Sequence, residues 1–188
     1  MSADLQVKGF AWLNLLTYVR ERHGDRTVDE LKAAFPQHAA LFDVKAVLPV
    51  GWVPAALHLG AIHWLVDHRH RKKLEGAQEV GRDLATRNVN NTFRSFPRLE
   101  DLKTALASTE RAFGQFYSRG KMHFTLKGDL LEARLTEFPW ATAIVGHSLG
   151  AGLVAFLKAG HVEATLLSVA VGPESIAYDV RFVLPEGA

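Results

Sequence analysis

One pentapeptide of the chain has residue types that could perform nucleophilic catalysis, the G-x-S-x-G sequence Gly146-His147-Ser148-Leu149-Gly150. In serine hydrolases the serine lies on a turn between a strand and a helix, and a histidine oriented by a carboxylate removes its proton. On that fold the acid and then the histidine follow the serine along the chain. The last histidine here is His161, and no Asp or Glu lies between it and Ser148. A conventional triad therefore cannot be assembled, and a hydrolase would need an upstream histidine such as His123.

The same glycines are typical of close helix packing. Gly146 and Gly150 are four residues apart, so on a helix they share one face and let its backbone approach a sheet. Ser148 would then point roughly the other way. We favour this structural interpretation, and a serine hydrolase that uses Ser148 is the alternative.

Three side chains near the end of a predicted helix have a spacing that could hold a metal ion. His63, Asp67 and His70 are separated by four and three residues and would align on one helical face, with water as a fourth ligand. The basic run 69–73 lies beside them, and cations are favoured at a helix C-terminus. We therefore favour a solvated helix end and no metal. The basic run could contact a phosphate, an acidic protein surface or nucleic acid, but it has no aromatic platform and two glutamates follow it.

Aromatic side chains gather at the junction of the two halves of the chain. They are mostly expected in the core, but a pocket that they line between helix and sheet would suit a small apolar ligand. The candidate ligand-binding residues are Phe113, Phe116, Tyr117, Trp140 and His147.

The elements that must position these side chains change period near residue 120. Residues 10–19, 55–70 and 74–88 have helical apolar spacing, and Thr27 resembles the first residue of a capping box. Residues 48–54 resemble an apolar loop, and Pro97 a helix start that leads to residue 118. Residues 122–135 and 162–183 alternate around turns as two hairpins, with an uncharged helix over 140–159 between them. The order ββαββ predicts a four-stranded antiparallel sheet with one buried face.

Composition narrows the class of protein. The 188 residues are 48% hydrophobic and 22% charged, with a net charge of +2, which is typical of a globular domain and weak evidence for nucleic acid binding. The absence of cysteine excludes disulfides, thiolate catalysis and cysteine-bound metals, in agreement with a cytoplasmic location. The N-terminus lacks a signal-peptide pattern. Residues 138–157 carry no fixed charge, but their proline, serine and glycines favour a buried helix over a membrane span.

Several short segments together resemble a known superfamily. They are Val7-Lys8-Gly9 before Leu13-Asn14-Leu15-Leu16 and Tyr18-Val19, Val50-Gly51-Trp52, Phe116-Tyr117-Ser118-Arg119-Gly120, and Gly172-Pro173-Glu174 before Tyr178-Asp179-Val180-Arg181-Phe182. Over nearly its whole length the chain is similar to the haem–nitric-oxide-binding-like and four-vinyl-reductase-like ligand-binding domains, and related families of unknown function share this layout. The chain lacks the cysteines of vinyl-reductase-like members and the Tyr-x-Ser-x-Arg spacing of haem-binding members. The resemblance implies a regulatory binding domain without obvious redox chemistry.

We therefore expect one α+β domain over 1–188, with a mainly helical part at 1–120 and a ββαββ part at 121–184. We expect it to be a non-enzymatic sensory domain that binds a small apolar ligand or a signalling protein. An exposed sheet face or edge strand would offer a homodimer contact. We expect no cofactor, no nucleic acid partner and no membrane span.

Overall fold

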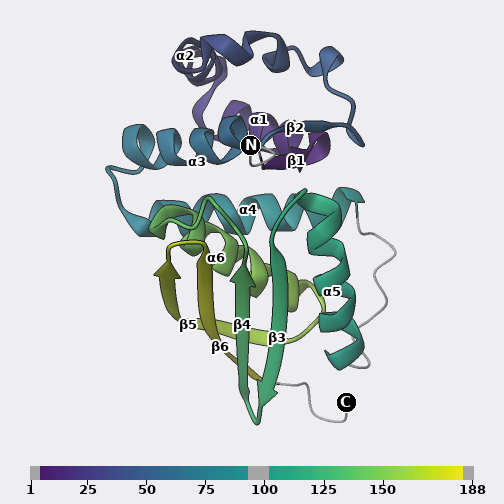
Figure 1. Ribbon diagram of the computed structural model, residues 1–188. Coiled ribbons are helices and arrows are strands. Elements are labelled where there is room, and N and C mark those ends of the chain that lie inside the picture. Colours follow the sequence, from purple (N-terminus) through teal and green to yellow (C-terminus); the bar gives the residue numbers. More distant parts are fainter. Residues whose placement is uncertain (1–4, 93–101, 184–188) are drawn as a thin grey trace.

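The computed structural model describes residues 5–92 and 102–183. Its first part, up to residue 116, is mainly helical, and most of these helices lie above a sheet-and-helix part, whereas the helix over 102–116 runs beside the sheet (Figure 1). The helices of the first part are α1 (Gly9–His23), α2 (Asp25–Ala34), α3 (Ala55–Arg69), α4 (Leu74–Thr92) and α5 (Leu102–Phe116), with short 3₁₀ turns η1 (Pro36–Phe42) and η2 (Val44–Ala46). The second part contains β3 (Lys121–Lys127), β4 (Leu130–Thr136), α6 (Ala143–Ala159), β5 (Glu163–Gly172) and β6 (Ser175–Val183). The predicted α+β class and the order ββαββ are confirmed.

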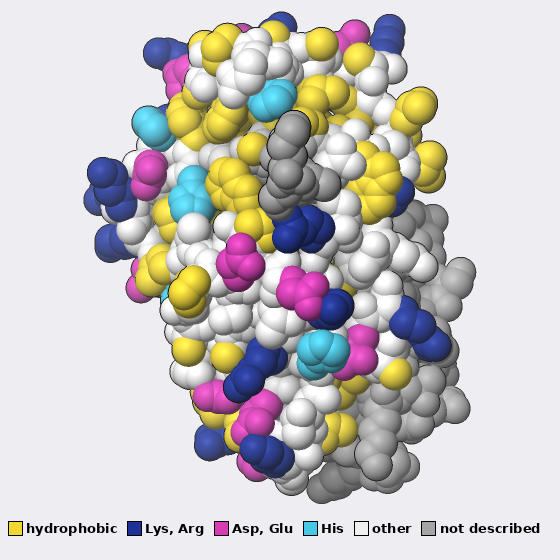
Figure 2. All heavy atoms as spheres, in the orientation of Figure 1, with side chains coloured by type: hydrophobic (Ala, Val, Ile, Leu, Met, Phe, Trp, Pro, Cys, Tyr) yellow, Lys and Arg dark blue, Asp and Glu magenta, His cyan; other side chains and the backbone are white. Residues whose placement is uncertain are grey.

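The four strands form an antiparallel sheet in the order β3-β4-β6-β5. Alternation along β3, β4 and β6 places apolar side chains on one face, and on β6 those of Ile176, Tyr178, Val180 and Phe182 are all buried, as predicted. In β5 the alternation is interrupted by a register shift between Leu166 and Ser168. The opposite face is polar: Figure 2 shows acidic, basic and histidine side chains interspersed over the strands. The exposed members of that face include Lys121, His123, Lys127, Arg134 and Arg181.

Helix α6 lies across the buried face of the sheet, and its glycines allow the approach. A Cβ added at Gly146 would lie 2.9 Å from Val169, and one added at Gly150 would lie 3.0 Å from the ring of Tyr178. These distances leave no space for larger side chains. Thr142 caps the helix, because its hydroxyl accepts a hydrogen bond of 3.2 Å from the backbone N–H of Val145. The helix therefore begins at residue 143, slightly after the predicted start.

Helix α4 packs on the other side of α6 and separates it from the N-terminal helices (Figure 1). The two backbones come closest at Gly81, where an added Cβ would lie 1.9 Å from the carbonyl oxygen of Ser148. Gly152 lies one turn further along α6, where an added Cβ would lie 3.4 Å from the carbonyl oxygen of Gly81. Glycine at position 81 is thus required by backbone on the neighbouring helix, which cannot rotate away as a side chain can.

Two local predictions in the first half are wrong. Residues 48–54 are not only a loop, because β2 (Trp52–Pro54) pairs antiparallel with β1 (Gln6–Lys8). Each strand is only three residues long, and its partner lies far away in sequence, so neither has a recognisable period. Thr27 does not cap α2, which begins at Asp25; its hydroxyl instead donates to the carbonyl oxygen of His23 at 2.9 Å. The predicted helix start at Pro97 lies outside the described residues.

Within the described residues, no helix combines the length and the apolar character needed to cross a bilayer. The uncharged helix α6 is instead largely buried between the sheet and α4.

Candidate functional site

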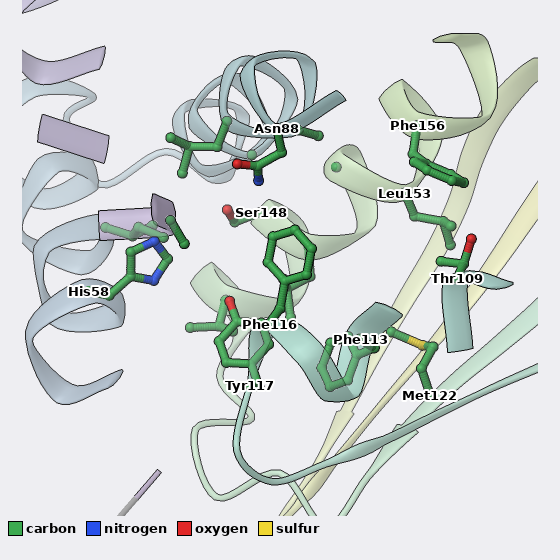
Figure 3. Close-up of a pocket in the computed structure, with 18 of the residues that line it drawn as sticks. His58, Asn88, Thr109, Phe113, Phe116, Tyr117, Met122, Ser148, Leu153 and Phe156 are labelled. Atoms are coloured by element: carbon green, nitrogen blue, oxygen red, sulfur yellow. The ribbon is translucent and has the colours of Figure 1, made fainter. Parts of the chain in front are cut away.

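The candidate site is a partly open cavity of about 190 Å³ lined by α3, α4, α5, α6 and β3, with one contribution from α1 (Figure 3). It lies beside the close α4–α6 contact, since Gly81, Ser148 and Gly152 of that contact all belong to its lining. The described lining residues are Ala11, His58, Leu59, Ile62, Gly81, Leu84, Ala85, Asn88, Val89, Thr109, Phe113, Phe116, Tyr117, Met122, Phe124, Val145, Ser148, Leu149, Gly152, Leu153 and Phe156.

Most of the wall is apolar and aromatic. The ring of Phe113 lies 5.1 Å from that of Tyr117 and 6.2 Å from that of Phe138, so the end of α5 is anchored against the core. Phe116 packs edge-on against Phe10 of α1 at 4.8 Å between ring centroids. These contacts hold the rings in place and leave a preformed space between them, as in many small-molecule sites.

His58 of α3 is the one histidine among the described lining residues. Its side chain is buried, with 4% exposure, and neither ring nitrogen has a hydrogen-bond partner in the part of the chain that the structure describes. Burial lowers the pKa of His58 to about 4, because the charged imidazolium would lose its hydration. The ring is therefore neutral near pH 7 and presents one donor and one acceptor.

Besides His58, the described lining contains four polar side chains, those of Asn88, Thr109, Tyr117 and Ser148. The side-chain oxygen of Asn88 accepts a hydrogen bond of 2.7 Å from Asn14, which leaves the amide N–H groups of Asn88 available. Burial raises the pKa of the Tyr117 hydroxyl, which stays protonated. Ser148 is buried on the side of α6 that faces α4. No Asp, Glu, Lys or Arg occurs among the described lining residues.

The structure brings together three of the five candidate ligand-binding residues, because Phe113, Phe116 and Tyr117 all line the cavity. Trp140 lies elsewhere, with its ring centroid 6.5 Å from that of His63. The ring of His147 is outside the lining as well, with its Nδ1 3.1 Å from the side-chain nitrogen of Gln78. Trp140 therefore lies beside the middle of α3 and His147 beside the start of α4, so closeness in sequence to the aromatic cluster did not place them in the cavity.

His58 is the polar lining residue that sequence reasoning missed. It stands between Leu57 and Leu59, both fully buried, in a helix whose apolar residues cover most of its circumference. A histidine inside such a run was a usable signal, because a buried imidazole is costly unless a partner satisfies it.

Ser148 does not lie on a strand-to-helix turn. It is in the second turn of α6, in a segment that runs unbroken from residue 143 to 159 beside an antiparallel sheet. No hydrogen bond joins its hydroxyl to a histidine within the described residues, and His123 is exposed on the outer, polar face of β3. The geometry of a nucleophile elbow is therefore absent at this serine.

The proposed metal ligands do not converge. The Nε2 atom of His63 is 2.9 Å from the hydroxyl of Thr142, Asp67 is exposed, and the Nδ1 atom of His70 is 3.7 Å from Glu79. No set of three His, Asp or Glu side chains is arranged to hold a metal ion within residues 5–92 and 102–183. In the adjoining basic run, Arg69 forms an ion pair with Glu30 on α2.

No protein-family model matches the sequence, and no curated protein matches it either. Solved structures do resemble the fold. An H-NOX protein from S. oneidensis in the Fe(II)NO ligation state aligns with a TM-score of 0.69 at 10% identity, covering 94% of this chain and 99% of that chain. An Fe(II) unliganded H-NOX protein from K. algicida aligns with a TM-score of 0.67 at 11% identity, covering 96% and 99%. The chain therefore has the fold of the H-NOX proteins, in agreement with the resemblance drawn from its sequence.

Proposed function

We propose that this chain is a non-enzymatic sensory or regulatory domain that binds a small apolar molecule in the cavity between α3, α4, α5, α6 and β3. The observation that carries the proposal is the cavity itself, preformed, aromatic-walled and about 190 Å³ in volume. A cavity of about 150 Å³ is large enough to bind benzene when its walls are apolar. The shared fold supports a sensory role, since the similar structures include an H-NOX protein with bound nitric oxide.

Haem is the group that this fold implies, because a similar structure is described by its haem and distorted porphyrin. The described lining of the cavity does not fit it. His58 could act as an axial ligand of the iron, but no Lys or Arg among these residues could pair with the two propionates. The volume of about 190 Å³ is also below the range of about 300–1,000 Å³ typical for ligands of drug size, and haem is at least that large. We therefore propose a ligand without a haem group.

We further propose that the ligand state is passed on through a homodimer, or through a signalling protein, at the edge strand β5. This strand is hydrogen-bonded on one side only and exposes Leu167 and Val171 at 46% and 43%. An unpaired edge with apolar side chains is a natural site of strand-to-strand association. Sedimentation velocity of the wild type and of Leu167→Lys tests this contact, and a wild type that stays monomeric at high concentration would contradict the homodimer.

The cavity proposal is tested by thermal unfolding with methylcyclohexane as an apolar probe. At about 100 times its Kd the probe should raise Tm by about 5 °C or more. Leu153→Trp places extra ring atoms in the cavity and should abolish the rise. Leu48→Trp makes the same change at a residue that is 71% exposed and does not line the cavity, and it should leave the rise intact. An unchanged Tm in the wild type, with no heat of binding by calorimetry, would refute the proposal.

A further inference from the structure

Most of the polar side chains of the cavity lie at one end of it, whereas Thr109, which already has an interaction within the protein, lies at the other end (Figure 3). In Figure 3, His58, Asn88, Ser148 and Tyr117 lie at one side, whereas Met122, Leu153 and Phe156 lie at the other. The four polar side chains come from four different helices or their ends, α3, α4, α6 and the residue after α5. Their convergence is therefore a property of the tertiary structure, and it divides the cavity into a polar end and an apolar body.

The environment of His58 is not explained by packing alone. It is 4% exposed and both ring nitrogens lack a partner within the described residues, although its sequence neighbours Leu57 and Leu59 are buried apolar side chains. A leucine at position 58 would give a comparable apolar contact without the cost of an unpaired buried polar group. A ligand with a hydrogen-bonding group would supply the partner that the protein does not.

The hydrogen-bonding capacity at this end is weighted toward donors. The oxygen of Asn88 already accepts a hydrogen bond from Asn14, whereas its amide group carries two N–H donors. Burial raises the pKa of the Tyr117 hydroxyl, which therefore keeps a proton that it can donate, and neutral His58 adds one ring N–H without a partner among the described residues. A ligand head that accepts hydrogen bonds, such as a carbonyl, ether or hydroxyl oxygen, matches these donors.

The charge of the ligand head is restricted by the same wall. No Lys or Arg among the described lining residues could compensate a carboxylate or phosphate, and no Asp or Glu could compensate an ammonium group. Burial of an unpaired ionised group is far more costly than burial of a neutral polar group. The described part of the wall therefore suits an uncharged ligand better than a charged one.

We propose that the cavity selects an uncharged amphipathic molecule, with an apolar body against Phe113, Leu153 and Phe156 and one hydrogen-bond-accepting head beside His58. This inference rests on the proposed function of the cavity and names the chemical class of its ligand. Because most of the polar groups lie at one end, the same contacts fix the orientation of the ligand.

The test uses three probes with a similar body, namely methylcyclohexane, cyclohexanone and cyclohexanecarboxylate, titrated by calorimetry at pH 7. The quantity measured is the affinity for the ketone divided by that for the hydrocarbon, compared between the wild type and His58→Leu. This comparison cancels the difference in hydration of the probes, as in a double-mutant cycle. Loss of one or more hydrogen bonds should lower the ratio about fivefold to tenfold. The carboxylate should bind at least about a hundredfold more weakly than the ketone.

His63→Leu is the matched control, because His63 is on the same helix but its Nε2 faces Thr142 and it does not line the cavity. The ratio of ketone affinity to hydrocarbon affinity in His63→Leu should equal that of the wild type. The ¹H–¹⁵N spectrum of the wild-type histidine rings provides a measurement that needs no variant. Cyclohexanone should shift the His58 ring nitrogens by fixing one tautomer, and methylcyclohexane should not.

The possible failures are distinct. If the ratio is the same in the wild type and His58→Leu, or if the His58 ring signals do not respond to the ketone, the ligand class is wrong while the cavity still binds apolar molecules. Equal affinities for the carboxylate and the ketone would also overturn the ligand class. If neither the hydrocarbon nor the ketone binds to the wild type, the proposed function fails together with this inference.

Discussion

Small residues allow close packing on both sides of helix α6, but the two interfaces differ in whether a cavity lies beside them. On the side that faces the sheet, Gly146 and Gly150 lie against Val169 and Tyr178, and the space is filled. On the side that faces α4, the backbones come close at Gly81, and residues of both helices beside this contact line the cavity. Glycine therefore closes one interface completely, and a cavity lies next to the other. The difference shows that a close contact at one point can lie beside an open space.

The largest effect is expected from Gly81→Ala, which breaks the contact on the cavity side. The new Cβ would lie 1.9 Å from the carbonyl oxygen of Ser148, so α4 and α6 must separate. We expect a loss of about 3 kcal/mol or more in the free energy of unfolding, at the upper end of overpacking effects. Chemical denaturation measures it.

Gly114→Ala is the control, because Gly114 is in α5 with nothing within 4 Å of an added Cβ. It should stabilise the protein by up to about 1 kcal/mol, as expected for alanine in an open helical position. Equal effects at positions 81 and 114 would contradict the tight α4–α6 contact.

The second largest effect is expected in the pH dependence of stability, through His58 on the cavity side. The pKa of His58 is about 4 in the folded protein and about 6.5 in the unfolded chain. Between these values only the unfolded chain binds this proton, so His58 lowers the free energy of unfolding as the pH falls from about 6.5 to about 4. The full effect is about 3 kcal/mol.

The His58→Leu variant has no imidazole at this position to be protonated on unfolding. Its loss of free energy of unfolding on acidification should therefore be smaller than that of the wild type, by up to about 3 kcal/mol. Denaturation curves at pH 7 and at pH 4.5 measure the difference. His68→Leu changes a histidine on the exposed side of the same helix, and it should lose as much stability between pH 7 and pH 4.5 as the wild type does. A parallel pH dependence in all three proteins would show that His58 is protonated in the folded state.

On the sheet side, Gly150→Ala should have a smaller effect than Gly81→Ala. Its Cβ would meet side chains, with the ring of Tyr178 at 3.0 Å and Leu166 at 3.1 Å, and side chains can shift by a few tenths of an ångström. We expect a loss of about 1–2 kcal/mol in the free energy of unfolding. A loss as large as that of Gly81→Ala would mean that the two sides of α6 are equally rigid.

The smallest effect is expected from Ser148→Ala, which removes one hydroxyl from the cavity side. The change in stability should be below about 1 kcal/mol, because the loss of one neutral hydrogen-bonding group is modest. Since Ser148 is held inside a regular helix, a fluorophosphonate probe should not label it. Covalent labelling of Ser148, lost in the alanine variant, would instead support a hydrolase.

Strong local periods made the second half of the chain predictable. Alternation over 122–135 and 162–183 defined both hairpins, and the uncharged stretch that ends at Gly160 defined α6, because these patterns involve neighbours in sequence. The glycines 146 and 150 were also assigned correctly to a helix face against the sheet. By contrast, β1 and β2 pair residues more than forty positions apart in runs of three, which leaves no local signal.

The chain by itself determined the class of the fold and the aromatic character of a pocket wall, because burial follows from apolar patterning. Only the tertiary structure decided that Phe113, Phe116 and Tyr117 meet His58, which is distant in sequence, while Trp140 and His147 point elsewhere. The physical reason is that a cavity is the space that remains when several elements pack. Its shape depends on contacts such as that between Gly81 and Ser148, which no periodicity within one element contains.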